Sequence, residues 1–181
     1  MPDCDTMLRA TFKELAELKN ITHSISTSTP DLMWAKDLHG RYLWANTQLA
    51  YKLYRTDVCV VVGSSDLELA SLCKEVQGKG NFTFGVTCAN SDTEVLRSMN
   101  SMKFLERGLV DGDELILEVH KNVLRDKLGN VIGTTGIGRD VTEEFKVLKA
   151  IAGNTKDLSA RKAMTDLMYK FWYENPDKGG D

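Results

Sequence analysis

The sequence lacks the long apolar run and the basic leader that direct a chain into or across a membrane. No stretch approaches 18 consecutive apolar residues, and residues 1–5 carry two aspartates where a secretion signal carries positive charge. Proline is scarce, with three in 181 residues, while 42% of the residues are hydrophobic, which is typical of a folded chain. We therefore expect a cytoplasmic protein with one globular domain and no membrane partner.

An excess of positive charge is also absent. Lys and Arg number 23 against 26 Asp and Glu, a net charge of −3, and we find no basic patch that would attract DNA or RNA. The four cysteines form no C-x-x-C pair, and there are only three histidines to supplement them. Structural zinc is therefore not expected, and the cysteines are interpreted as small buried hydrophobes. Neither nucleic acid nor a metal is a predicted partner.

The first third of the chain predicts a helix, a linker and a hairpin. Leu8, Phe12, Leu15 and Leu18 recur at helical spacing, which indicates a helix over residues 5–22. The Ser/Thr-rich residues 24–30 are typical of a hinge. Residues 32–36 and 41–45 favour two strands around a turn at residues 37–40. Asn46 is then placed to cap a short helix over residues 47–54.

The remaining chain predicts short helices, three strands and two closing helices. Residues 57–91 read as loops and short helices, and Ser91 or Asp92 caps a helix that reaches residue 99. Strands follow at 102–109, 114–125 and 131–139, then helices over 141–153 and from about 157 to 171, and a frayed tail at 175–181. This order predicts an α+β fold: a five-stranded antiparallel sheet with short helices on one face and flanking helices at both ends. We divide the chain into a flanking helix and hinge (1–29), the main domain (30–142) and C-terminal helices (143–181).

Two blocks of sequence resemble the PAS family. Residues 36–46, Lys-Asp-Leu-His-Gly-Arg-Tyr-Leu-Trp-Ala-Asn, resemble the opening hairpin of a PAS domain, whose usual form is K-D-x-x-G-R-Y-x-x-x-N. Residues 117–126, 129–133 and 136–143 resemble its last two strands and the D-[IV]-T signature that leads into an output helix. The resemblance covers about residues 30–143. In detail, the sequence of these blocks is similar to that of PAS modules in bacterial histidine kinases and diguanylate cyclases.

The resemblance implies a sensor of bacterial signal transduction, for example in a two-component system. A cupped sheet would face short helices across a small ligand cavity, and the flanking helices would pair in a homodimer and pass the signal to a downstream output domain. The apolar stripes of both flanking helices favour a parallel homodimer independently. The alternative is a ligand-free module for protein–protein interaction. Whether the chain is a fragment or a stand-alone protein stays open, since residues after 142 show neither a kinase nor a cyclase motif.

No catalytic site is predicted. Cys88, Asp92 and His120 could be imagined as nucleophile, orienter and base, but no elbow motif surrounds the cysteine. The glycines between residues 129 and 138 lack both phosphate-loop spacings. Any kinase or cyclase activity would lie in a region outside this chain.

The cofactor is left unknown. Haem is not expected, because the helix that holds the axial histidine in haem-binding PAS modules has no histidine here. Covalent flavin is not expected either, since nothing resembles the N-C-R-F-L-Q motif, whereas noncovalent flavin and a small organic ligand stay open.

The candidate ligand-binding residues are mostly aromatic. They come from segments that the PAS fold brings around one cavity, although for each residue taken singly simple filling of the core is the favoured reading. These candidates are Trp34, Trp44, Phe82, Phe84, Met102 and Phe104. His120 shares a strand face with Glu118 and Asn122, an unusually polar row. If the row faces the cavity, His120 contacts a ligand; if it faces out, the row is solvated or lies under the flanking helix.

Asp140 and Thr142 are the candidate signal-relay residues. By resemblance they anchor the junction between the last strand and the output helix. Asp140 also suits a helix N-cap with Glu143 three residues on, and that capping role is the alternative reading.

Overall fold

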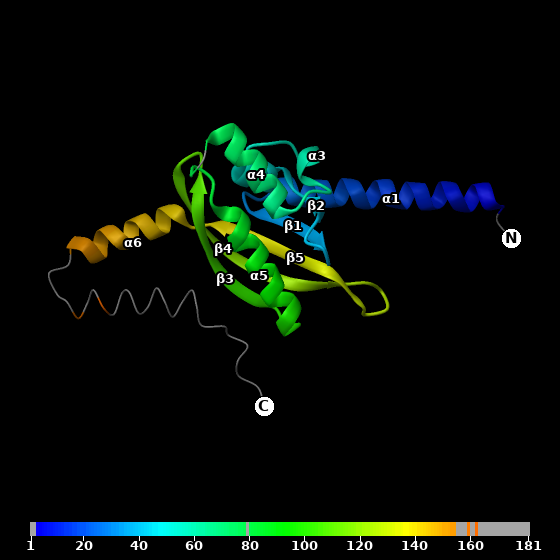
Figure 1. The fold of residues 1–181 in the computed structure, drawn as a ribbon. Coiled ribbons are helices and arrows are strands. Elements are labelled where there is room, and N and C mark those ends of the chain that lie inside the picture. Colours follow the sequence, from blue (N-terminus) through cyan, green and yellow to red (C-terminus); the bar gives the residue numbers. More distant parts are fainter. Residues whose placement is uncertain (1–2, 79, 155–158, 160–161, 163–181) are drawn as a thin grey trace, which may run out of the picture.

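The computed structural model describes residues 3–78, 80–154, 159 and 162 and confirms the α+β fold (Figure 1). In chain order its elements are α1 (Cys4–Thr27), β1 (Leu32–Asp37), β2 (Tyr42–Ala45), α2 (Thr47–Tyr54), α3 (Val58–Val61), α4 (Asp66–Gln77), α5 (Phe84–Ser98), β3 (Met102–Val110), β4 (Asp113–Arg125), β5 (Val131–Asp140) and α6 (Thr142–Asn154). The helix predicted from about residue 157 to 171 and the tail at 175–181 lie outside the described residues, apart from 159 and 162.

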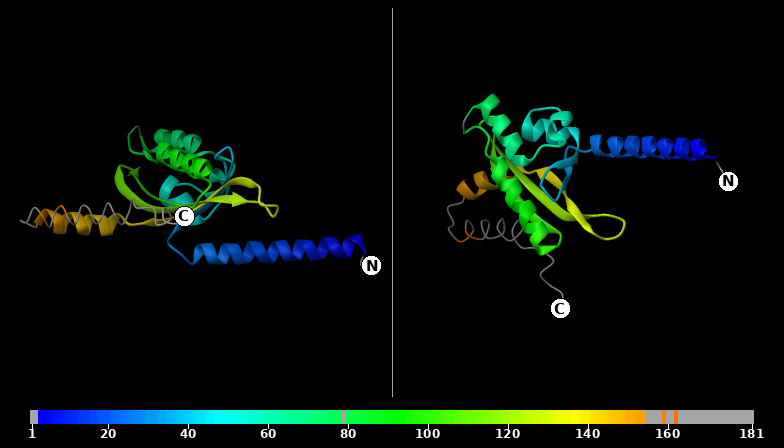
Figure 2. Two further views of the ribbon diagram at one scale, coloured as in Figure 1. Left: turned by 90° about the horizontal axis from the view of Figure 1, so that it is seen from below. Right: turned by 45° about the vertical axis from the view of Figure 1, so that its right-hand side comes forward.

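The five strands form one antiparallel sheet in the order β2-β1-β5-β4-β3. Helices α4 and α5 lie over one side of it, here called the inner face, while α1 extends away from the domain (Figure 2). Alternation along β1 sends Leu32, Trp34 and Lys36 to the inner face, where all three are buried. Between β2 and β3 the chain passes through the helices α2 to α5. The last strand, β5, lies in the middle of the sheet, between β1 and β4.

The main core lies between the inner face and the helices. Trp34 packs flat on Gly136 of β5, where a Cβ atom would collide with the indole ring. Tyr54, Phe82 and Phe84 follow as neighbouring rings, with centroids 5.7 Å and 6.4 Å apart. A second, small cluster of Ile116, Val141, Phe145 and Leu105 covers the start of α6. The sheet is thus fixed from both sides at the point where α6 leaves it.

Two predicted helix boundaries are wrong. Helix α1 continues to Thr27, through half of the expected hinge, because the Ser26 and Thr27 hydroxyls donate back to the His23 carbonyl and satisfy the helix end. Helix α5 begins at Phe84, so Ser91 and Asp92 are interior residues and not caps. Their polar side chains looked like a helix start in the sequence, but tertiary contacts hold them instead.

Asn46 caps α2 as predicted and also connects three elements. Its Oδ1 accepts hydrogen bonds from the backbone N–H groups of Leu49 and Met33, both 3.0 Å. Its Nδ2 donates to the carbonyls of Ser26 and Asp31. One buried amide thereby ties the end of α1 to β1 and α2.

Candidate ligand site and signal junction

Five ionisable side chains from five elements meet in the core. Lys36 of β1 and Lys121 of β4 are each 1% exposed, and the carboxylates are Asp66 of α4, Asp92 of α5 and Glu106 of β3, between 2% and 6% exposed. We call these five residues the buried charge cluster. Fully buried lysines are rare unless they are paired, so each charge here depends on its partners.

Asp92 joins the two lysines of the cluster. Lys36 Nζ lies 2.6 Å from one oxygen of Asp92 and 2.6 Å from Asp66. Lys121 Nζ lies 2.8 Å from the other oxygen of Asp92 and 3.1 Å from Glu106. The chain of ion pairs therefore runs across the whole inner face, from β1 through α5 to β3.

Neutral side chains supply the other hydrogen bonds of the carboxylates. The hydroxyls of Tyr42 and Tyr54 lie 2.8 Å and 2.9 Å from Asp66 Oδ1 and donate to it. At the other end of the cluster, Ser91 and Cys88 donate to Glu106. Because every carboxylate has a charged and a neutral donor or two charged ones, the cluster is compatible with burial.

The cluster sets the protonation of its members. Burial alone would lower the pKa of Lys121, but the charges of Glu106 and Asp92 outweigh it and raise that pKa. Burial disfavours ionisation of Asp92, yet the two lysines outweigh it and lower its pKa. For Cys88, burial and the nearby carboxylates raise the pKa well above its usual value, so the thiol is protonated and is no nucleophile at neutral pH.

Most of the aromatic candidates lie in the core. Trp34, Phe82 and Phe84 are buried, and Phe104 packs against them. Met102 is half-buried at the start of β3, with its sulfur 3.3 Å from the Ser98 hydroxyl of α5. The structure therefore brings five of the seven candidates to the inner side of the sheet.

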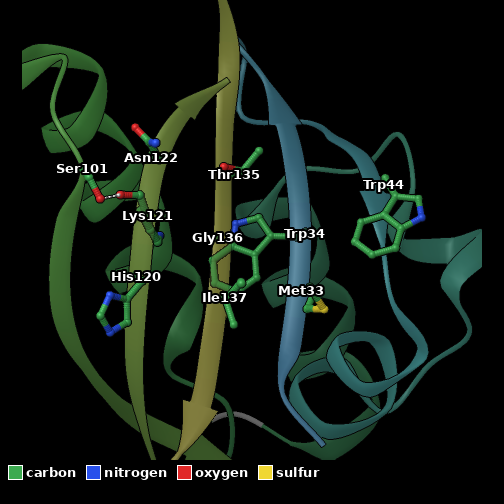
Figure 3. A pocket seen from close by; sticks show the side chains of 10 residues that line it. All are labelled: Met33, Trp34, Trp44, Ser101, His120, Lys121, Asn122, Thr135, Gly136 and Ile137. Atoms are coloured by element: carbon green, nitrogen blue, oxygen red, sulfur yellow. Dashed lines mark hydrogen bonds between the residues drawn. The ribbon is translucent and has the colours of Figure 1, made fainter. Parts of the chain in front are cut away.

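Trp44 and His120 lie on the opposite side of the sheet, the outer face. The His120 side chain is 58% exposed and contacts Glu118 at 3.1 Å, and Trp44 pairs with Ala35 across the β1–β2 ladder. Both rings line a hollow of about 330 Å³, together with Met33, Trp34 and Ile137. Figure 3 shows the residues around it. Of the two alternatives left open for His120, the structure has the outward one, because the period of two puts Lys121 on the inner face instead.

A cavity of about 290 Å³ opens beside the buried charge cluster. We call it the hairpin pocket; it lies between the β1–β2 turn and the helices α4 and α5. Asp66, Asp92 and Thr134 form its polar wall. The other lining residues are Asp37, Leu38, His39, Gly40, Ser65, Leu67, Ala89, Thr93 and Leu96.

The junction between β5 and α6 is held by two side chains. Asp140 Oδ1 accepts hydrogen bonds from the backbone N–H and the hydroxyl of Thr142, at 3.1 Å and 2.7 Å. Thr142 Oγ1 in turn accepts from the Ile116 N–H of β4 at 2.9 Å. Asp140 therefore binds the first residue of α6 from the end of β5, one position further from the helix than an ordinary N-cap.

A model of the PAS fold family matches residues 26–145, well over half of the chain. The chain belongs to the PAS family. No protein with a curated description matches the sequence. Members of this family generally serve as sensory, non-catalytic modules, and no catalytic family matches.

Solved structures share the PAS fold with this chain. The Vibrio cholerae VqmA–ligand–DNA complex superposes with a TM-score of 0.54 at 22% identity, over 85% of this chain and 66% of that one. The phage VqmA–DPO complex gives 0.54 at 18%, over 88% and 69%. The PAS domain of a Colwellia psychrerythraea protein gives 0.50 at 17%, over 70% and 98%. The chain thus spans two thirds or less of the V. cholerae VqmA chain, and at these identities the likeness shows the fold alone.

None of the described helices is long and apolar enough to cross a membrane. No group of three or more metal-ligating side chains occurs among the described residues either.

The buried charge cluster was missed in the sequence, although a signal for it exists. In β1 the inward positions are Leu32, Trp34 and Lys36, and in β4 they include Val119 and Lys121. A charged residue in the inward phase of a PAS strand needs a buried partner. The pattern therefore indicates that the two lysines are buried, but it does not name their partners.

Proposed function

We propose that this chain is a sensory PAS module of a bacterial signal-transduction protein that detects a small molecule between its sheet and helices. The buried charge cluster beside the hairpin pocket carries the proposal. Packed hydrophobic side chains of the same volume would stabilise the core as well or better. Five buried charges next to a cavity are more readily understood as recognition of a polar ligand.

The relay of the signal is proposed to follow β4 and β5 to α6. Lys121 of the charge cluster and Ile116, whose N–H donates to Thr142, both belong to β4. A ligand that shifts the cluster would therefore move the strand that holds the start of α6. Asp140 and Thr142 are the proposed relay residues, and Asp140→Ala is expected to raise hydrogen exchange in α6 and to make it insensitive to the ligand.

A homodimer through the flanking helices is the proposed assembly. Helix α1 has 24 residues, about 36 Å of helix, and the described chain buries only Ser26 of it. Leu8, Leu15, Leu18 and Ile25 are each 55–61% exposed along it. A second copy of α1 would cover this stripe in a parallel pair. The proposed organisation is thus a flanking helix (1–29), the sensory domain (30–142) and helices (143–181) leading to an output domain.

Several finer expectations belong to the same proposal: a histidine kinase or two-component context, a cytoplasmic location, and no nucleic-acid partner. The absence of a nucleic-acid partner stays a prediction, since the similar VqmA has been solved in complex with DNA. The second candidate function is a ligand-free interaction module, which the exposed stripe of α1 would also serve.

Native mass spectrometry of the freshly purified chain, compared with its denatured mass, tests the proposal in one spectrum. A dimer with extra mass supports the sensor. A dimer at the bare mass that also binds nothing from a small-molecule panel favours the interaction module. Leu15→Asp, in the exposed stripe of α1, should yield monomers that still retain the ligand. The matched control Tyr51→Asp, at an exposed position of α2, should leave the dimer intact. A wild-type chain that stays monomeric at tens of micromolar would refute the assembly.

A further inference from the structure

The hairpin pocket combines two features that together select a kind of ligand. Its polar wall is acidic, and one hydroxyl in that wall has no hydrogen-bond partner in the part of the chain that the structure describes. Thr134 of β5 is 1% exposed, and its Oγ1 has no hydrogen-bond partner among the described residues. A buried hydroxyl without a partner is destabilising, and a ligand that bonds to it would remove that cost.

The wall is also negatively charged. The buried charge cluster sets two ammonium groups against three carboxylates, which leaves one negative charge in excess when all five are ionised. Lys36 lies behind Asp66 and Asp92, and no lysine or arginine lines the pocket among the described residues. Asp37, at the rim, adds a third carboxylate to the lining. His39 is the one basic side chain among the described residues of the lining, so an anionic ligand would meet three carboxylates with no lysine or arginine to balance them.

Acceptor positions remain free on this wall. A carboxylate offers about four lone-pair sites. Asp92 accepts two hydrogen bonds, from Lys36 and Lys121, and Asp66 accepts three, from Lys36 and two tyrosines. Together with Thr134, these two carboxylates give the lining of the pocket three acceptor-bearing side chains. An ammonium group has three N–H donors and no acceptor, which is the complementary set.

We propose that the hairpin pocket binds a small primary amine, with its ammonium group on Asp66, Asp92 and Thr134. Its apolar body would lie against Leu38 and Leu96, which also line the pocket. This inference rests on the proposed sensory function and adds the chemical class of the ligand. The ammonium group would balance the excess charge of the cluster, so amine binding is coupled to the position of Lys36 and Lys121.

The test compares ligands that differ only in the terminal group. Calorimetric titration of the full chain at pH 7 uses ethylamine, isobutylamine and phenethylamine, each against the alcohol and the carboxylate of the same skeleton. At least one amine is expected to bind tenfold or more tightly than both of its analogues. An alcohol or carboxylate that binds as tightly as the amine, or failure of all three amines to bind, overturns the inference.

Thr134→Val separates binding from folding. Valine keeps the shape and strand propensity of threonine, so the variant is expected to be as stable as the wild type or more stable, while its amine affinity falls about tenfold. Thr135→Val, the neighbouring residue on the outer face, is the matched control and should change neither. Unchanged amine affinity in Thr134→Val contradicts the inference.

The proposed function and this inference can fail separately. If native mass spectrometry finds a neutral or anionic molecule in the purified protein, the sensor proposal stands and the amine is wrong. If nothing is retained and no member of the panel binds, both are wrong.

Discussion

Replacing Lys121 by methionine removes one of the two cations of the buried charge cluster and keeps an unbranched side chain of similar length. In the wild type, Nζ of Lys121 lies 2.8 Å from Asp92 and 3.1 Å from Glu106, and it also donates to the Ser91 hydroxyl at 2.7 Å. The variant leaves one ammonium group against three buried carboxylates. We expect a large loss of stability because the carboxylates keep their burial but lose a partner.

The size of the loss follows from what the carboxylates retain. Breaking a buried ion pair costs about 3–5 kcal/mol. Asp92 still has Lys36, and Glu106 still accepts from Ser91 and Cys88, so the lower end applies, about 3 kcal/mol. For a chain of this size, 1 kcal/mol corresponds to about 2–4 °C, so Tm should fall by roughly 6–12 °C.

Urea unfolding followed by circular dichroism measures this loss. Lys103→Met is the matched control, because Lys103 pairs with Glu118 at 3.1 Å on the outer face, where both side chains remain 15–17% exposed. That pair should contribute no more than about 1 kcal/mol. Adding Glu106→Gln to Lys121→Met should recover at least about 1 kcal/mol, since it removes one unbalanced negative charge. A Lys121→Met chain within about 1 kcal/mol of the wild type would refute the reasoning.

Three further predictions follow from the same contacts. The pKa of Asp92 is lowered in the folded state, so the ionised side chain stabilises the fold above its unfolded pKa near 3.8, and this stabilisation is lost as pH falls through the lower folded pKa. Between pH 5 and 2, the free energy of unfolding of Asp92→Asn should therefore depend less on pH than that of the wild type. Asn46→Ala should lower the free energy of unfolding in urea by about 2–4 kcal/mol, more than the loss of a helix cap alone, because backbone groups near the end of α1, in β1 and in α2 lose their hydrogen-bond partner. Gly136→Ala should force the Trp34 indole away from β5, which should lower the free energy of unfolding by about 1–3 kcal/mol and lower Tm. The tryptophan fluorescence should change, and an unchanged spectrum would contradict the prediction.

The sequence patterns predict the strands of the sheet well, but they do not predict the partners in the buried charge cluster. The strand and turn patterns after residue 100 predicted β3, β4 and β5 to within about one residue at most ends, because alternation and turn chemistry act locally. Asn46 was identified as a cap for the same reason. Ser91 and Asp92 were misassigned as caps, since their residue types favour a helix start in any sequence, and the partners that hold them inside α5 come from β3 and β4.

The sequence by itself determined the five-stranded sheet, its order of elements and the membership of the PAS family. Only the tertiary structure decided that Lys36 meets Asp92, 56 positions away, and that His120 faces out while Lys121 faces in. The physical reason is that secondary structure depends on neighbours along the chain, whereas the partners of a buried charge are chosen by how helices pack across a sheet. The hairpin pocket, and the Thr134 hydroxyl that finds no partner among the described residues, exist only at that level.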